Sequence, residues 1–415
     1  MNHKQTLAII LILALFLRII DALIIPIFEK PDEKAHFEYI KFISDNKKLP
    51  VQQQGQRSAE FFQPPFYHFI ASFLLSFIKI FTQDISYQVY LFRIISDLIS
   101  IITLYVIYKI AFLIFNDKTL SLGVLIFASF LPSHINMNSN VTNSNFGDLL
   151  SVFIIYLLLI ILMKEKKQKI ILLLGLIAGI SLITRFSVIP AIITIPFAFI
   201  LKYYTDIRKV IKPIALICII ALLIASWHFI RNFMLYGDPL GINAVKLSSP
   251  KDEIKLDFIF AARLVGWTFI TFWASFGRTN GAFIGNLTSS IGIVIFILSY
   301  LLFLIFTFSS IYGLYIFLKK YRKNKNILSS NQRKAFMILV FHLIILSLLF
   351  LSFNFYDFQP QGRLFFPAMP ALAIFFTLGI YNLFKSNNIN KFLQTYFIIF
   401  ILINIASIIS ITINF

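Results

Sequence analysis

Three side chains that could take part in acid–base chemistry follow the first apolar segment of the sequence. Residues 6–27 are apolar and form a run long enough to cross a bilayer, which takes about 20 residues. Asp32, Glu33 and His36 come shortly after this run. Two neighbouring carboxylates at a membrane surface can act as a general base and its partner, or can bind a metal ion. A solvated start of a loop is the alternative interpretation of the same residues.

Further ionisable residues are predicted near the same face of the membrane. Charges at membrane depth are costly and often mark functional sites. Arginine binds phosphate through its planar fork of N–H groups, so carboxylates mixed with arginines suit an enzyme with a phosphate leaving group. The alternative interpretation of each arginine is that its side chain extends to the membrane surface and has no functional role. The residues are His134, Asp148, Arg185, His228, Arg231, Asp238, Arg263, Arg278, Asp357 and Arg363.

Two of these positions stand out by their local sequence. Asp148 follows a segment rich in asparagine and begins a predicted span, so it either complements the helix dipole or completes a site with Asp32. Arg363 lies between Gly362 and an apolar run, where the glycine allows a close approach of the backbone. We therefore predict that Arg363 binds an anionic group, with Arg231 and Arg185 as the next candidates.

The composition identifies a polytopic helical membrane protein. The 415 residues are 59% hydrophobic and 13% charged, with a mean hydropathy of +0.84. The single cysteine, Cys218, excludes an intramolecular disulfide and a cysteine zinc site. The net charge of +19 comes from clusters of Lys and Arg in short loops between apolar runs. Such clusters indicate the orientation of a membrane protein and not the binding of nucleic acid. No phosphate-binding loop, dinucleotide-binding glycine pattern or His-Glu-x-x-His motif is present in the sequence.

The apolar runs and the positive clusters predict about eleven spans. Clusters at 164–169, 202–212 and 319–334 all fall on the cytoplasmic side only if the run 64–82 does not cross the membrane. We therefore expect 64–82 to be an interfacial or re-entrant helix, with the amino terminus inside. The predicted spans are 6–27, 89–115, 119–135, 146–163, 170–184, 186–201, 213–231, 288–318, 335–353, 365–384 and 392–413.

This topology predicts one transmembrane domain, 1–415, with two long external loops. Residues 28–88 form the first and carry Asp32. Residues 232–287 form the second, in which 256–276 is apolar and is interpreted as a helix lying on the membrane surface. Long loops on one face of a helical bundle usually carry function.

Several short motifs, in this order, resemble those of a known class of membrane enzymes. The sequence is similar to the GT-C class of glycosyltransferases, and more specifically to polyprenyl-phosphate-sugar-dependent transferases. These are related to protein O-mannosyltransferases and the lipid A aminoarabinose transferase, with a DUF2142-like group as the closest pattern. The motifs are Pro31-Asp32-Glu33-x-Ala35-His36-Phe37, Gln63-Pro64-Pro65-Phe66-Tyr67, Trp227-x-x-x-Arg231-Asn232, Tyr236-Gly237-Asp238-Pro239, Phe272-Trp273 with Phe276-Gly277, and Gln361-Gly362-Arg363 before Phe366-Pro367-Ala368-x-Pro370-Ala371-Leu372.

The resemblance implies an inverting transfer of a sugar from a polyprenyl-phosphate donor at the external membrane face. Asp32 matches the catalytic acid of the first loop, with Glu33 beside it, and Asp148 matches a second acidic position. His36, Asp148 and His228 are expected to line the site or to contact the acceptor. Arg363, Arg231 and Arg185 are expected to bind the donor phosphate. The sequence departs from the pattern at Arg185, where relatives often carry lysine.

The resemblance leaves the partners open in part. The acceptor is a lipid, a glycan or a protein, membrane lipids surround the chain, and no nucleic acid is expected. No cofactor is certain, and a divalent metal (Mg or Mn) held by Asp32 and Asp148 stays an open alternative. The frequent use of Ile, Phe, Lys and Asn is typical of an AT-rich prokaryotic genome, so we expect a cell-membrane protein of a prokaryote.

A transporter or flippase of a lipid-linked anion is the rival class. Transporters place ionisable residues near the middle of the membrane and commonly contain internal repeats. This sequence places most of them at the ends of spans and shows no detectable repeat. The enzyme is therefore the favoured interpretation.

Overall fold

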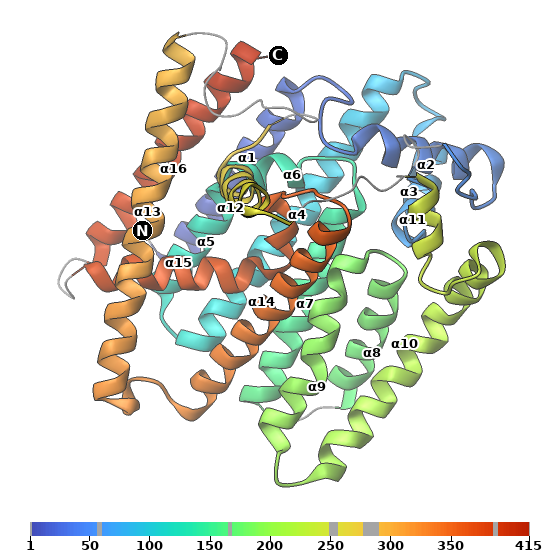
Figure 1. The fold of residues 1–415 in the computed structure, drawn as a ribbon. Helices are drawn as coiled ribbons and strands as arrows, with labels where there is room; N and C mark the ends of the chain where they lie inside the picture. The colour runs from blue at the N-terminus through green and yellow to red at the C-terminus, as the bar shows by residue number, and fades with distance from the viewer. Residues whose placement is uncertain are drawn as a thin grey trace.

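The computed structural model describes a bundle of helices that agrees with the predicted fold class. The described residues are 2–55, 60–164, 168–248, 256–276, 290–384 and 389–414. Within them, nine helical segments are long and apolar enough to cross a membrane. They are α1 (His3–Ile24), α4 (Ile85–Phe115), α7 (Asn143–Met163), η1 (Phe186–Val188) with α9 (Ile189–Tyr203), α10 (Ile207–Tyr236), α13 (Ser290–Lys323), α14 (Ser330–Tyr356), η3 (Gly362–Ala368) with α15 (Met369–Leu383), and α16 (Ile389–Asn414) (Figure 1).

Shorter elements complete the chain between these long helices. Two of them, α5 and α6, pass as one further span that bends by 63° at Leu131. Leu131 precedes Pro132, and a residue before proline is forced out of the helical conformation. The shorter elements are α2 (Glu33–Asn46), α3 (Phe66–Ile78), α5 (Lys118–Phe130), α6 (Pro132–Asn138), α8 (Gln168–Leu182), α11 (Ile242–Ser248), α12 (Phe258–Trp273) and η2 (Lys325–Ile327).

The described residues therefore give nine or ten candidate spans, against the predicted eleven. The remaining predicted span, 170–184, corresponds to α8, which has 15 residues. Its small residues Gly175 and Gly179 pack directly against Ile220 and Ile224 of α10. A helix of this length reaches about 22 Å, less than the hydrocarbon core of about 30 Å.

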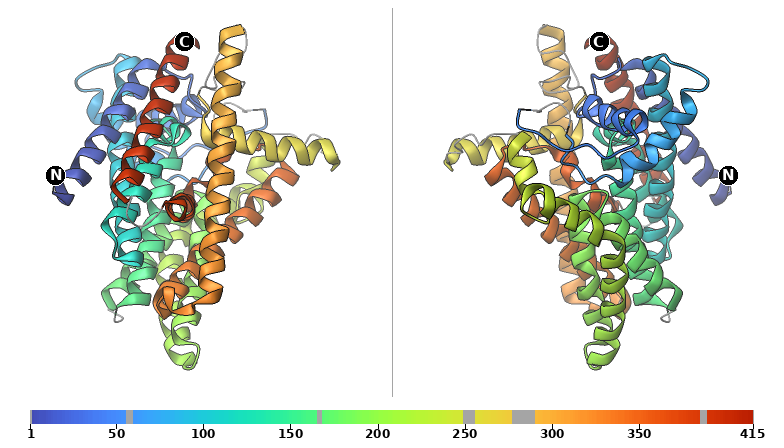
Figure 2. Two further views of the ribbon diagram at one scale, coloured as in Figure 1. Left: turned by 90° about the vertical axis from the view of Figure 1, so that its left-hand side faces the viewer. Right: turned by 90° about the vertical axis from the view of Figure 1, so that its right-hand side faces the viewer.

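The two segments that were predicted to lie at the membrane surface form short helices. The run 64–82 contains α3, whose 13 residues extend about 20 Å. It packs against α2, and their side chains join the start of α4 in a small separate apolar cluster. The run 256–276 contains α12, which lies across the direction of the long helices in Figure 2.

The main apolar core surrounds α5 at the centre of the bundle. Every residue from Leu120 to Phe130 is buried, and the aromatic side chains of Trp273, Phe376 and Phe400 close around Phe127. Most of the long helices run roughly along one direction, whereas α15 lies across α13, and the turns between α9 and α10 and between α13 and α14 lie at the same end (Figures 1 and 2). The pair α2 and α3 lies toward the other end.

Candidate active site

Asp32 lies in an unusual backbone conformation between α1 and α2. It occupies the position before the first residue of α2, with φ of 62° and ψ of −1°. This left-handed conformation is rare for residues other than glycine, although aspartate tolerates it. The side chain of Asp32 does not cap α2 and instead contacts Arg363, with 2.6 Å between Oδ2 and Nη2. The two residues are 331 positions apart in the sequence.

Arg363 is held in this position by its own loop and by α12. Its Nε donates a hydrogen bond to Gln361 Oε1 at 2.5 Å. The backbone N–H of Gly362 donates to Thr271 Oγ1 at 2.7 Å. A Cβ atom at Gly362 would lie 2.3 Å from the backbone nitrogen of Phe272, so only glycine fits there. The close backbone approach that was predicted at Gly362 is therefore a contact with the backbone of α12.

A small pocket next to this ion pair contains the second predicted acid and the second arginine. Asp148 lies near the start of α7, and Arg185 lies in the turn before η1. Nη1 of Arg185 donates to Asn143 Oδ1 at 3.2 Å. The pocket thus presents two guanidinium groups, one carboxyl group and several hydroxyl groups. Its lining residues are Met137, Thr142, Ser144, Asp148, Arg185, Ser187, Arg363, Leu364, Phe366 and Pro367.

The electrostatic surroundings keep Asp32 ionised. Burial alone would raise the pKa of the Asp32 carboxyl, but the Arg363 guanidinium, with help from Arg185, outweighs this effect and holds the pKa below its ordinary value. The side chain of Asp32 remains 39% exposed, so a second molecule can reach it. The carboxylate is therefore charged and accessible at neutral pH.

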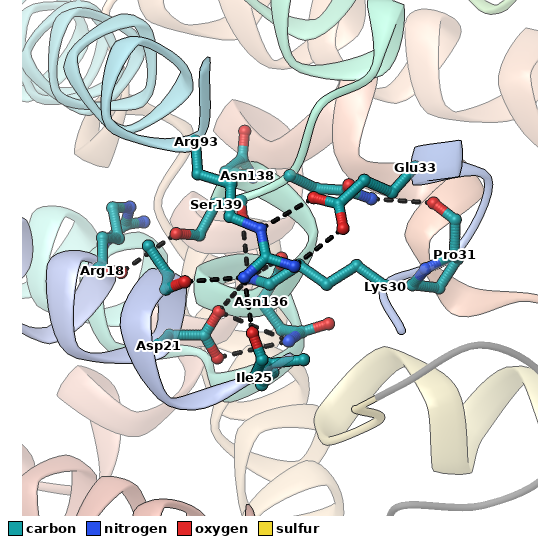
Figure 3. Close-up of polar contacts among 12 residues, drawn as sticks. Arg18, Asp21, Ile25, Lys30, Pro31, Glu33, Arg93, Asn136, Asn138 and Ser139 are labelled. Atoms are coloured by element: carbon teal, nitrogen blue, oxygen red, sulfur yellow. Dashed lines mark hydrogen bonds and ion pairs between the residues drawn. The ribbon is translucent and has the colours of Figure 1, made fainter. Parts of the chain in front are cut away.

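Glu33 points away from this pocket, although it is the next residue in the chain. Its carboxylate forms a two-pronged pair with Arg93 of α4, with two N···O distances of 2.7 Å, and neither side chain is exposed (Figure 3). Glu33 also accepts the backbone N–H of Phe28 at 2.8 Å. The predicted partner of Asp32 is thus engaged in a buried ion pair.

The remaining donors of Arg93 close the end of α1. They bind the carbonyl groups of Ala22 and Ile25 at 2.6 Å and that of Pro26 at 2.8 Å. A helix end leaves such carbonyls without partners, and Arg93 supplies donors for them. The segment that leads from α1 to Asp32 is therefore fixed at both of its ends.

A second buried cation holds the same segment. Nζ of Lys30 pairs with Asp21 of α1 and donates to the carbonyl of Ser139 at 2.6 Å (Figure 3). Asp21 also accepts from Nδ2 of Asn136 at 3.2 Å. This cluster was not among the predicted site residues, although charged residues such as Asp21 and Arg93 inside apolar runs are a signal that points to it.

His36 lies one turn after Asp32 and contacts two residues that the sequence analysis did not select. Its Nδ1 lies 2.8 Å from Nε2 of His68 in α3. Its Nε2 lies 3.8 Å from Oε2 of Glu60. Burial raises the pKa of Glu60 to about 7, and the negative charge of Asp32 adds to this rise. Glu60 therefore belongs to the same electrostatic group as Asp32.

Other predicted residues lie outside this group. Arg231 on α10 donates to the carbonyl of Pro50 at 2.6 Å. His228, one turn earlier, lies 3.3 Å from the amide nitrogen of Asn232. Asp238 caps the turn after α10 by accepting two backbone N–H groups. The described residues of the second loop are 232–248 and 256–276, so the predicted residue Arg278 lies outside them.

The two carboxylates that were considered as metal ligands do not fit a divalent cation. Asp32 is paired with Arg363, and Asp148 shares its pocket with Arg185 and Arg363. In the part of the chain that the structure describes, no three acidic, histidine or cysteine side chains converge on one point. Two arginines in the pocket favour an anion there.

Comparisons with solved structures identify the fold as that of the GT-C class. The structure of ArnT from Cupriavidus metallidurans bound to undecaprenyl phosphate matches with a TM-score of 0.58 and 12% identity, over 94% of this chain and 62% of that chain. The Archaeoglobus fulgidus oligosaccharyltransferase in complex with Zn and sulfate matches with a TM-score of 0.51 and 13% identity, over 97% and 52%. The chain thus spans less than two thirds of either protein.

A sequence comparison points to the same class. The profile of the family described as dolichyl-phosphate-mannose-protein mannosyltransferase matches residues 63–230. The matched segment contains Asp148 and Arg185, begins after Asp32 and ends before Arg363. A search of curated proteins finds no match for the sequence. Together with the apolar helices, these results describe a multi-pass membrane protein with a GT-C fold.

Proposed function

We propose that this protein is a membrane glycosyltransferase that uses a polyprenyl-phosphate-linked sugar as its donor. The observation that carries the proposal is the contact between Asp32 and Arg363 at the edge of a pocket that holds a second arginine. This arrangement combines an ionised carboxylate with a cationic site for a phosphate. The match to a mannosyltransferase family and the likeness to an ArnT structure with bound undecaprenyl phosphate support the same class of donor.

Asp32 is the general base in this proposal. The hydroxyl oxygen of the acceptor forms a bond to the anomeric carbon of the sugar, and its proton moves to the carboxylate of Asp32. The bond between that carbon and the phosphate oxygen breaks, and its electron pair stays on the phosphate. Attack from the face opposite the leaving phosphate inverts the configuration at the anomeric carbon.

Arg363 and Arg185 bind the donor phosphate. The phosphate becomes more negative as the sugar leaves, so a fixed guanidinium stabilises the transition state more than the bound donor. Arg363 uses Nε for Gln361 and Nη2 for Asp32, whereas among the described residues Nη1 contacts only the sulfur of Met137, at 3.9 Å. N–H groups of Nη1 are therefore available to a phosphate oxygen while the contact with Asp32 persists.

The reaction is proposed to take place at the external face of a prokaryotic cell membrane. The clusters 202–212 and 319–334 belong to turns at one end of the long helices, and such clusters are retained in the cytoplasm. The helices that follow Asp32 lie toward the other end. A lipid, glycan or protein acceptor would reach Asp32 from that side.

The decisive experiment is incubation of the purified protein with defined polyprenyl-phosphate sugars, with mass spectrometry of the lipid products. We expect polyprenyl phosphate to accumulate when an acceptor is present. The transporter alternative predicts instead that the donor stays intact and only changes leaflet in proteoliposomes. Intact donor under all conditions, together with such movement, would replace the proposed function by transport.

A further inference from the structure

Glu60 and His36 form an unassigned pair of polar groups beside the candidate base. Oε2 of Glu60 accepts a hydrogen bond from Gln63 at 3.3 Å and lies 3.8 Å from Nε2 of His36. The side chain of Glu60 is 21% exposed, and that of His36 is 3% exposed. Glu60 also has a φ of 41°, and a non-glycine residue in this region often marks a functional site.

Hydrogen bonds connect Glu60 with the pocket. Nε2 of Gln63 donates to Glu60, and Oε1 of Gln63 accepts from Nδ2 of Asn143 at 3.3 Å. Oδ1 of Asn143 in turn accepts from Nη1 of Arg185, which lines the pocket. Besides burial, the negative charge of Asp32 raises the pKa of Glu60, whereas the positive charges of Arg363 and Arg185 lower it. A ligand in the pocket therefore lies near Glu60.

His36 and His68 form a buried pair of neutral rings beside Glu60. The ring of His36 stacks on His68, which in turn stacks on Tyr39 with 4.0 Å between ring centroids. Burial lowers the pKa of His36 to about 3 and that of His68 well below its ordinary value, so both rings are neutral. One nitrogen of each neutral ring carries a hydrogen, and the other accepts.

The hydrogen bond between the two rings admits both arrangements. Nδ1 of His36 and Nε2 of His68 lie 2.8 Å apart, so one of them donates and the other accepts. Among the described residues, Nδ1 of His68 has no hydrogen-bond partner that would select one arrangement. Nε2 of His36 therefore faces Glu60 either as a donor or as an acceptor.

The gap between Glu60 and His36 suits a hydroxyl group. A distance of 3.8 Å is too long for a direct hydrogen bond, but one oxygen between the two atoms can bond to each. With a pKa of about 7, Glu60 carries a proton in about half of the molecules at neutral pH and can donate it. A hydroxyl can accept from one of these two groups and donate to the other in either arrangement, whereas an ionised carboxylate or phosphate oxygen can only accept.

We propose that Glu60 and His36 together bind a hydroxyl group of a substrate, which belongs either to the sugar of the donor or to the acceptor. This inference rests on the proposed function and adds to it the site that recognises a hydroxyl. The isoprenoid phosphate itself does not contact the pair.

The test compares Glu60→Ala and His36→Asn with the wild-type protein in steady-state kinetics. Asparagine at position 36 can keep the hydrogen bond to His68 but has no atom at the place of Nε2. Glutamine at this position places its amide group near Nε2 instead, so His36→Gln has the opposite effect. We expect each of Glu60→Ala and His36→Asn to raise one KM about 2-fold to 10-fold, the effect of losing one hydrogen bond between uncharged groups. The control is Glu38→Ala on the same helix, because Glu38 is 40% exposed and pairs only loosely with Lys34.

Which KM value changes shows whether the hydroxyl belongs to the donor sugar or to the acceptor. A rise in the acceptor KM with unchanged hydrolysis of the donor by water assigns the hydroxyl to the acceptor. A rise in the donor KM with slower hydrolysis assigns it to the sugar. In both cases undecaprenyl phosphate, used alone as a probe, should bind to the variants as it does to the wild type. Weaker binding of this probe, or two unchanged KM values, would overturn the inference.

The dependence on pH gives an independent readout. Glu60 changes its charge as the pH passes through about 7, so the affected KM should depend on pH in this range. Glu60→Gln does not titrate, so this dependence should vanish while most of the affinity remains. If the wild type transfers sugar and these variants behave like it, only the hydroxyl site is refuted. A wild type that transfers no sugar from any donor refutes the proposed function and this site together.

Discussion

Asp32 and Glu33 show how two neighbouring carboxylates acquire different tasks. The left-handed backbone at Asp32 turns the chain, so that Asp32 faces Arg363 while Glu33 faces Arg93. The first is partly exposed and bordered by a pocket, and the second is enclosed by α1 and α4. Only Asp32 can therefore receive a proton from a bound molecule.

The role of Asp32 can be tested by an isosteric change. Asp32→Asn keeps the size of the side chain and removes its basicity, so we expect turnover to fall by about 100-fold or more. Binding of undecaprenyl phosphate should persist, because the amide oxygen can still contact Arg363. Turnover would be measured by release of polyprenyl phosphate in the presence of acceptor. Near-normal turnover of the variant would show that another group removes the proton.

Arg363 should affect donor binding, turnover and the pH profile together. Arg363→Ala should weaken donor binding and slow turnover, and Arg363→Lys should be intermediate because lysine keeps the charge without the planar fork. Without Arg363, burial is the dominant influence on Asp32, so its pKa rises. The fall of kcat at acidic pH should then begin at a higher pH in Arg363→Ala than in the wild type.

The corresponding control is Arg263→Ala on α12, which removes an arginine that does not line the pocket. Its kinetics should match those of the wild type. A pH profile of Arg363→Ala that overlays that of the wild type would contradict the coupling between Arg363 and Asp32.

The sequence predicted part of this site because its motifs place unusual residue types at the ends of spans. Asp32 and Arg363 were both selected, although their contact across 331 positions was not predictable from spacing. Glu60 was missed because it lies outside the motif that begins at Gln63, and its approach to His36 follows from the packing of α2 and α3. Glu33 was interpreted as the partner of Asp32 because adjacency in sequence does not reveal the direction of a side chain.

At the scale of elements, the segment between α1 and α2 is held by two buried ion pairs. Lys30 with Asp21 and Glu33 with Arg93 lie on either side of Asp32 in the sequence. Buried charges that lose their partner are costly, whereas a pair removed together costs less. These pairs thus make the conformation of Asp32 depend on α1, α4 and α6 at the same time.

This dependence predicts a loss of stability rather than a selective loss of chemistry when a pair is broken. Arg93→Met or Glu33→Gln should each lower stability, by about 3–5 kcal/mol for a buried charge left alone. The double variant should lose less than the sum of the two. Thermal unfolding in detergent measures these effects, with Lys34→Ala as an exposed control. If Glu33→Gln unfolds at the wild-type temperature and is inactive, Glu33 takes part in the reaction directly.

The same scale explains which helices were predictable. Long apolar runs with capping residues, such as Asp84 before α4 and Asp117 before α5, gave helices close to the expected ranges. The bend between α5 and α6 follows from Pro132, but its angle depends on the packing of both helices. The short α8 was predicted to span because hydropathy does not measure how a helix is covered by its neighbours.

At the scale of the whole molecule, the GT-C fold places basic turns at one end of the bundle and the loop of Asp32 toward the other (Figure 1). The uneven distribution of the net charge of +19 then indicates how the protein is oriented in the membrane, because lysine and arginine are enriched in cytoplasmic loops. An enzyme with its donor phosphate bound near α7 and η3 would receive acceptors from outside the cell. The orientation is therefore part of the proposed function and needs its own test.

Cysteine labelling can test the orientation, because Cys218 is the only native cysteine. On a Cys218→Ser background, Lys48→Cys places a thiol after α2, while Thr205→Cys and Lys323→Cys place thiols in the basic turns. All three positions are exposed. A maleimide that cannot cross membranes should label Lys48→Cys in intact cells, and the other two only after permeabilisation. Labelling of Thr205→Cys in intact cells would show the opposite orientation, because a reagent that cannot cross the membrane reaches a turn only from the side on which the turn is exposed. The proposed transfer would then have to draw on a donor and an acceptor of the cytoplasmic face.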